Sequence, residues 1–281
     1  MRSVRAAIGR DHGLAAWRSA WLAPPVAALG LIFAYPFAWM VGRAFSAPDG
    51  GYGLAAFEAI LRSRGFIASL LATGRISLTA TAICVVLGVT LALAIRFAPF
   101  PGARVVSRVI DAYLAFPSFL IAIALTFVYG SSGFLHSLLA GAGGRSFLFG
   151  FWGVVIAEVT YYTPFVVRPL LAALDSLDIA QLEAASSLGA RPIEVLRRIV
   201  LPAMMPSLFA GGSLCLLLTI NEFGIILIMG VKHSITLPML IYGKAIEEFD
   251  YPGASAVAIC NVALSLSLYL VYRSAMRRLQ R

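Results

Sequence analysis

The chain has 281 residues, of which 60% are hydrophobic and only 12% are charged, so a water-soluble domain could not bury its apolar surface. The net charge of +9 comes from basic residues that flank apolar segments, which argues against a nucleic-acid-binding patch. The three cysteines each lie inside an apolar segment without ligand spacing, so we expect neither a disulfide framework nor a metal site.

Six apolar segments are long enough to cross a bilayer as helices, which takes about 20 residues. They cover residues 21–45, 69–95, 105–130, 147–171, 204–230 and 254–272. The first is longer than the apolar part of a signal peptide, so we expect an uncleaved helix. The predicted fold class is therefore an all-α integral membrane protein with six transmembrane helices. A basic segment, 1–20, precedes the membrane domain, 21–272, and a basic tail, 273–281, follows it.

The distribution of basic residues predicts the orientation in the membrane. Fifteen of the 22 Lys and Arg residues lie on the side that holds both termini and the segment 172–203, and seven lie on the other side. Since Lys and Arg accumulate on the cytoplasmic side, we expect both termini and the segment 172–203 to be cytoplasmic.

The segment 172–203 has the signals of two short helices joined by a tight turn. Asp178 is a good N-cap for a helix through Leu188, and Gly189 suits the left-handed position that ends it. Pro192 fits the first turn of a second helix over 193–200, which the following Leu-Pro pair is expected to close. Arg191, at the N-cap of this second helix, offers no acceptor side chain.

This segment resembles the EAA loop of permease subunits in binding-protein-dependent ABC importers. The resemblance rests on the sequence Glu183-Ala184-Ala185, on Gly189, and on Ile199 with Leu201-Pro202. It implies a type I importer permease fold in a bacterial inner membrane. It also implies that the first helix is a coupling helix that docks onto a separate ATPase, with Glu183 facing a basic residue there.

The same resemblance implies the partners. They are two ATPase subunits, a second permease that is a copy or a homologue, a periplasmic solute-binding protein and membrane lipid. The chain has no GxxxxGK[ST] motif, so ATP and Mg²⁺ are expected to be used by the ATPase, with no cofactor held by this chain. The protein is thus predicted to be a transport subunit without catalytic residues.

Polar groups inside the spans are candidates for the solute path, because ionisable residues in lipid are costly. The candidates are Glu158, Tyr161, Tyr162, Asn221 and Glu222. The alternative is that each carboxyl group is paired or hydrogen-bonded within the helix bundle. Asp111, three residues after Arg108 at a helix end, is expected to form a local ion pair.

The outer segment 231–253 is predicted to contain a short helix at the membrane surface. Its expected face consists of Leu237, Leu240, Ile241, Lys244 and Ala245. In the resembled family this region faces the binding protein; a helix that only closes the outer end is the alternative. His233 alone does not make a metal site.

The residues 221–230 (NEFGIILIMG) and 235–251 (ITLPMLIYGKAIEEFDY) resemble permeases of 2-aminoethylphosphonate importers. Similar arrangements occur in permeases for sulfate or molybdate, polyamines and ferric iron, and these solutes stay open. An ion-coupled secondary transporter would use Glu158 and Glu222, but it would not need the charged loop. A membrane-embedded enzyme would need a convergent nucleophile or metal set, and the three histidines lie far apart.

Overall fold

The structure is a computed structural model that describes residues 21–46, 50–98, 100–130, 149–229 and 235–279. These residues are helical apart from turns and one β-bridge between Ser46 and Tyr52. Among them, five helices are long and apolar enough to cross a membrane, and the number is six if a bent helix pair is counted as one span. The predicted basic segment 1–20 and all three histidines lie outside the described residues.

The helices follow one another in the order of the predicted spans. The first span, Trp21–Ala44, includes η1 (Gly30–Ala34) and α2 (Tyr35–Ala44). It is followed by α3 (Ala55–Arg62), α4 (Arg64–Phe97), α5 (Ala103–Tyr113), α6 (Ser118–Tyr129) and α8 (Phe151–Asp175). The remaining elements are α9 (Ile179–Ser187), α10 (Pro192–Val195), η4 (Leu196–Val200), α11 (Leu201–Ile220), α12 (Gly224–Met229), α13 (Leu237–Tyr242), η5 (Gly243–Glu247) and α14 (Tyr251–Leu279).

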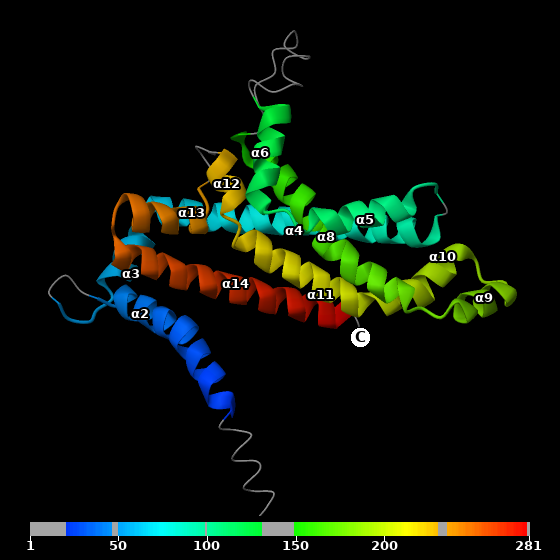
Figure 1. Cartoon of the computed structure of the whole chain (residues 1–281), viewed down its shortest axis with the longest axis horizontal. Helices are drawn as coiled ribbons and strands as arrows, with labels where there is room; N and C mark the ends of the chain where they lie inside the picture. Colours follow the sequence, from blue (N-terminus) through cyan, green and yellow to red (C-terminus); the bar gives the residue numbers. More distant parts are fainter. Residues whose placement is uncertain (1–20, 47–49, 99, 131–148, 230–234, 280–281) are drawn as a thin grey trace, which may run out of the picture.

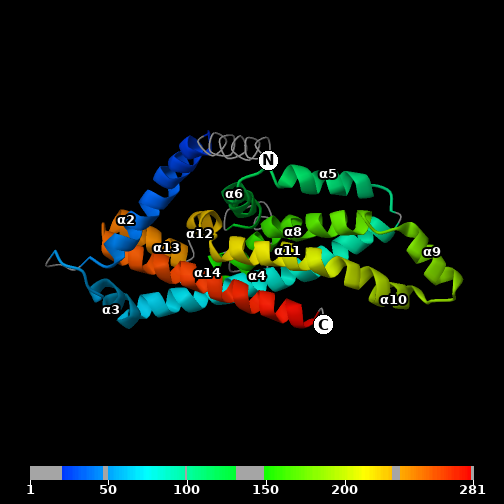
Figure 2. The ribbon, with the colours of Figure 1, turned by 90° about the horizontal axis from the view of Figure 1, so that it is seen from below.

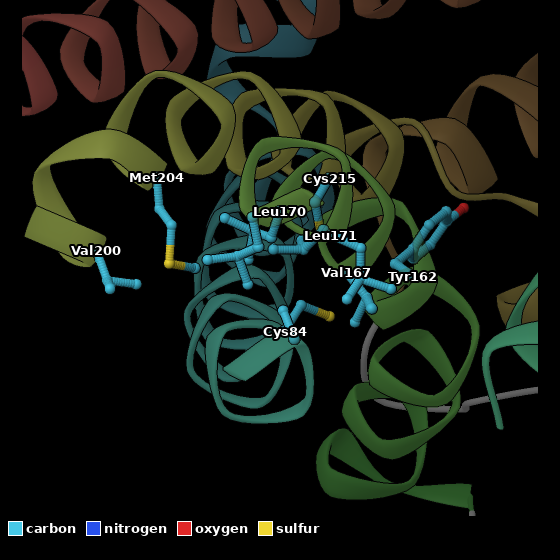
Figure 3. Packing of buried hydrophobic residues seen from close by; sticks show 11 residues of the cluster. Cys84, Tyr162, Val167, Leu170, Leu171, Val200, Met204 and Cys215 are labelled. Carbon is cyan, nitrogen blue, oxygen red and sulfur yellow. The ribbon is translucent and has the colours of Figure 1, made fainter. Parts of the chain in front are cut away.

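The centre of the bundle is formed by α4, α8 and α11, which approach closely at two glycines. A Cβ added to Gly88 of α4 would lie 2.7 Å from Cγ1 of Val166 on α8, and one added to Gly211 of α11 would lie 3.2 Å from Cα of Val166. Small residues let membrane helices pack backbone against backbone. Around this contact, Cys84, Leu170 and Cys215 are fully buried in one apolar cluster (Figure 3).

The third predicted span is not one straight helix, which corrects the expectation for 105–130. It consists of α5 and α6, which are bent by 113°. Pro117 is the N-cap of α6 with an extended backbone (φ −64°, ψ 144°), and a proline disfavours helical conformation in the residue before it. The fifth predicted span is also interrupted, because α11 ends at Ile220 and α12 begins at Gly224.

The segment 172–203 and the outer segment lie at opposite ends of the bundle. Figures 1 and 2 both show α9 and α10 at one end and α3 and α13 toward the other, and α14 runs from the α3 end toward the α9 end. This separation fits the prediction that the segment 172–203 and the outer segment face opposite sides of the membrane. The first span diverges from the bundle (Figure 1), and its residues 21–39 are all exposed, so its apolar surface is available for lipid or a neighbouring subunit.

Candidate functional site

The α9 helix begins and ends as its sequence predicts. Oδ1 of Asp178 accepts the Ala180 N–H at 2.9 Å, which is an N-cap bond. At the other end Gly189 has φ +82°, its N–H donates to the Ser186 carbonyl at 3.0 Å, and the Ala190 N–H donates to the Ala185 carbonyl at 3.1 Å. These two bonds with a left-handed glycine form a Schellman motif, which satisfies carbonyl groups at the helix end.

The second helix begins at Pro192, as predicted, but it does not end at Leu201-Pro202. It continues through η4 into α11, and the Leu201 N–H donates five residues back, to the Leu196 carbonyl. This wider π-helical turn leaves room for the Pro202 ring, which would clash in a regular α-helical turn.

The start of α10 at Arg191 is stabilised by Glu194, a residue that the sequence analysis missed. The Arg191 backbone N–H donates to Oε2 of Glu194 at 3.0 Å. A glutamate three residues after the N-cap is half of a capping box and was visible in the sequence. The start of α10 therefore does not depend on the side chain of Arg191.

The motif residues of this loop remain open to a partner. Glu183, Ala184 and Gly189 are exposed, and within the described part of the chain Glu183 makes no ion pair. Leu188 is 89% exposed. Toward the bundle, Leu182 and Ser186 border an apolar cavity of about 410 Å³ that α4 also lines. Of the other motif residues, Ala185, Ile199 and Leu201 are partly buried, and Pro202 is exposed.

The structure brings two of the five solute-path candidates, Tyr162 and Glu222, into direct contact. Glu222 lies in the break between α11 and α12 and is 5% exposed. Its carboxylate accepts the hydroxyl of Tyr162 on α8, the hydroxyl of Ser118 on α6 at 3.1 Å and the N–H of Ile225 on α12 at 2.8 Å. One side chain thus joins three helices at a point where the backbone is not helical.

Glu158 lies one helical turn before Tyr162 on α8 and is 0% exposed. Tyr162 lies four residues further on, on the same face of α8, and its hydroxyl donates to Glu222, so the second carboxyl group lies on the same side of α8 as Glu158. Among the described residues, neither of its carboxylate oxygens has a hydrogen-bond partner. The two carboxyl groups therefore differ: Glu222 is held by three donors and Glu158 by none in this part of the chain.

Tyr161 and Asn221 point to other partners. The Tyr161 hydroxyl donates to the Phe116 carbonyl at 2.9 Å, so α8 supports both helix breaks, the one before Pro117 and the one at Glu222. Asn221 is exposed; its Nδ2 donates to the Leu217 carbonyl at 2.8 Å.

The Asn221 side chain also joins α11 to α14 through residues that the sequence analysis missed. Its Oδ1 accepts the Asn261 amide at 3.0 Å, and Ser265 lies 3.5 Å from its Nδ2. Asn261 was detectable, because it is a polar residue in the middle of a predicted span.

Asp111 does not pair with Arg108, which corrects that expectation. It forms an ion pair with Arg168 of α8, whose guanidinium also lies 3.4 Å from the Ser107 carbonyl. The partner comes from the helix packed against α5, and the sequence neighbours of Asp111 did not indicate it.

The outer segment contains the predicted short helix, α13. Its apolar side packs inside the bundle: Leu237 is fully buried, and its N–H donates to Oγ1 of Thr73 on α4 at 2.8 Å. Lys244 lies 3.0 Å from Asp250 and 3.3 Å from Glu248. Burial alone would raise the pKa of Asp250, but the Gly253 N–H and the Lys244 ammonium lower it below its ordinary value. Burial opposes the charge of Lys244, yet these carboxylates raise its pKa.

Several known proteins are similar to this chain. A putative 2-aminoethylphosphonate transport system permease protein, PhnU of Salmonella typhimurium, is 45% identical over 263 residues, which cover 92% of each chain. The sulfate transport system permease protein CysT of Synechococcus elongatus is 30% identical over 259 residues, covering 91% of this chain and 88% of the relative. Among solved structures, a bacterial ABC transporter involved in alginate import matches with a TM-score of 0.81 and 20% identity, covering 98% of this chain and 99% of that chain.

The structural likeness shows the fold: the chain has the type I ABC importer permease fold, as the EAA resemblance predicted. The family model described as binding-protein-dependent transport system inner membrane component matches residues 84–281, which is well over half of the chain. The chain therefore belongs to the family of binding-protein-dependent transport permeases, the multi-pass membrane subunits of ABC importers.

Proposed function

We propose that this chain forms the membrane path of an ATP-driven importer for 2-aminoethylphosphonate and that α9 couples it to a separate ATPase. The observation that carries the solute assignment is the 45% identity to PhnU over 92% of both chains, against 30% to the sulfate permease. The residues 221–230 and 235–251, which resemble permeases of 2-aminoethylphosphonate importers, include the helix break at Glu222.

The shape of the segment 172–203 supports the coupling role. A short capped helix ends in a rigid glycine turn and carries small, exposed residues, so another protein can approach its backbone closely. Glu183 adds an exposed charge without an ion-pair partner in the described chain. In this proposal two ATPase subunits bind ATP and Mg²⁺ and receive α9 in a groove, with Glu183 opposite a basic side chain.

The remaining partners follow from the proposed architecture. A second permease, identical or homologous, completes the path, and a periplasmic binding protein delivers the solute at the end that carries α3 and α13. Both termini and α9 face the cytoplasm of a bacterium, whose inner membrane holds the complex. The separation of α9 and α3 at opposite ends of the bundle supports this orientation (Figure 1).

The test is uptake by the reconstituted complex of permease, ATPase and binding protein in proteoliposomes. We expect uptake of labelled 2-aminoethylphosphonate that requires ATP and that excess sulfate does not inhibit. Transport of sulfate in place of the phosphonate would refute the solute assignment. Uptake that persists without the ATPase and follows a proton or sodium gradient would refute ATP coupling and indicate a secondary transporter.

A further inference from the structure

Glu158 stands out because it is a fully buried carboxyl group without a hydrogen-bond donor among the described residues. Its exposed fraction is 0%, and nowhere in the described residues do its two oxygens meet a donor. A bare ionised carboxylate is strongly unfavourable inside a membrane protein. Glu158 therefore needs either a proton or a positively charged ligand.

The surroundings of Glu158 add negative charge and supply no compensating cation. Tyr162, one turn further along the same face of α8, donates its hydroxyl to Glu222, which brings a second carboxylate to the Glu158 side of α8. Figure 3 shows the Tyr162 hydroxyl pointing away from the apolar cluster. Across the residues that the structure describes, no Lys or Arg pairs with either glutamate. The carboxylate of Glu222 has accepted three donors, and two oxygens offer about four acceptor directions, so it can accept one more.

The chemistry of the two carboxyl groups selects among cations. A divalent metal needs several hard ligands, and the described chain contains no group of three or more His, Cys, Asp or Glu residues that could hold one. A primary ammonium group carries one charge and three N–H donors, which two carboxylates can accept. The solute proposed above contains such a group.

We propose that Glu158, assisted by Glu222, accepts the primary ammonium group of the transported solute and so selects for amines. The proposal rests on the proposed transport function and adds which residues recognise which end of the solute. Glu222 is the member of the pair nearer the protein surface: it keeps 5% exposure at the break between α11 and α12, and the preceding Asn221 is exposed, whereas Glu158 lies one step deeper with 0% exposure. When an ammonium group binds, it supplies the charge and the donors that Glu158 lacks, and a proton held by Glu158 is released.

The first test compares Glu158→Gln with Glu158→Asp and Glu58→Gln in the reconstituted complex. We expect Glu158→Gln to raise the KM for 2-aminoethylphosphonate about 10-fold or more, the effect of losing one charged hydrogen bond. Glu158→Asp keeps the charge and should recover part of the affinity. Glu58→Gln makes the same change on an exposed glutamate of α3 and should leave uptake unchanged.

Thermal unfolding of the solute-free complex separates recognition from a structural role. Glu158→Gln removes no hydrogen bond within the described chain, so its unfolding temperature should equal that of the wild type. Added 2-aminoethylphosphonate should raise the unfolding temperature of the wild-type permease–ATPase complex, and ethylphosphonate, which lacks the amine, should not. The Glu158→Gln complex should respond to neither. A lower unfolding temperature of the solute-free Glu158→Gln complex would overturn the recognition role.

The outcomes distinguish this proposal from the proposed function. Equal KM values for 2-aminoethylphosphonate in the wild type and Glu158→Gln would overturn the amine site and leave the transport function standing. If the wild type instead imports a polyamine such as putrescine, and Glu158→Gln impairs that uptake, the solute assignment fails and the amine site stands. Import of sulfate alone would overturn both.

Discussion

The turn at Gly189 allows a specific prediction, because a substitution there changes the free-energy cost of the left-handed backbone and little else. Gly189 has φ +82°, and a Cβ built on it would meet no atom within 4 Å in the described structure. Gly189→Val therefore creates backbone strain without a steric clash. A left-handed conformation costs an L-residue roughly 1–2 kcal/mol, and a β-branched side chain is at the upper end of that range or beyond.

This cost is confined to the segment 172–203, the proposed coupling loop. The strain acts on the two hydrogen bonds that end α9, from the Gly189 N–H to Ser186 and from the Ala190 N–H to Ala185. Because the buried core of α4, α8 and α11 does not involve Gly189, we expect membrane abundance and thermal unfolding of the permease to change little. ATPase co-purification and solute uptake should fall, because α9 is displaced.

The matched control is Gly189→Asn, because asparagine adopts the left-handed conformation at a lower cost than other non-glycine residues. We expect uptake in the order wild type, Gly189→Asn, Gly189→Val, and nearly normal uptake for Ser187→Ala on the preceding turn. Uptake is measured per assembled complex, and ATPase association by co-purification. Equal uptake by Gly189→Val and Ser187→Ala would refute the reasoning that this turn positions the coupling helix.

Three further changes test other parts of the molecule. Glu183→Lys should abolish uptake at normal membrane abundance, because it puts like charges together at the proposed ATPase contact; normal uptake would remove the coupling role. Glu222→Gln should lower the free energy of unfolding in detergent by roughly 1–3 kcal/mol, since an amide nitrogen cannot accept the Tyr162 hydroxyl. Unchanged stability would contradict the role of Glu222 in holding α6, α8 and α12 together at the break between α11 and α12. The pKa of Asp250 is lower in the folded protein than its ordinary value of 3.8. The wild type should therefore be more stable than Asp250→Asn above pH 3.8, and this difference should disappear as the pH falls through the lowered pKa of the folded state. A difference that persists at still lower pH would show that it does not come from the Asp250 charge.

The accuracy of the sequence-based predictions depended on how local each feature is. Asp178, Gly189 and Pro192 were placed correctly because a cap, a left-handed glycine and a helix-starting proline act within a few residues. The end expected at Leu201-Pro202 was wrong, because a π-helical turn absorbed the proline and let the helix continue. Local rules for proline do not include this rearrangement.

The two helix breaks were missed for a related reason. The stretches around Pro117 and Glu222 are predominantly apolar, so hydropathy alone predicts one uninterrupted span in each region. Whether a proline kinks a helix slightly or bends it by 113° depends on the partners that satisfy the freed backbone groups. Here one such partner is Tyr161, 45 residues away from the Phe116 carbonyl that it binds.

The sequence by itself determined the membrane class, the approximate spans and the capped helix and glycine turn of the segment 172–203, because composition, span length and capping are local properties of the chain. Only the tertiary structure decided which polar groups meet. It joined Glu222 to Ser118 and Tyr162, paired Asp111 with Arg168, and left Glu158 without a donor among the described residues. These contacts join helices that are distant in sequence, and their pairing is set by the close packing of α4, α8 and α11 around small residues, which no single segment encodes.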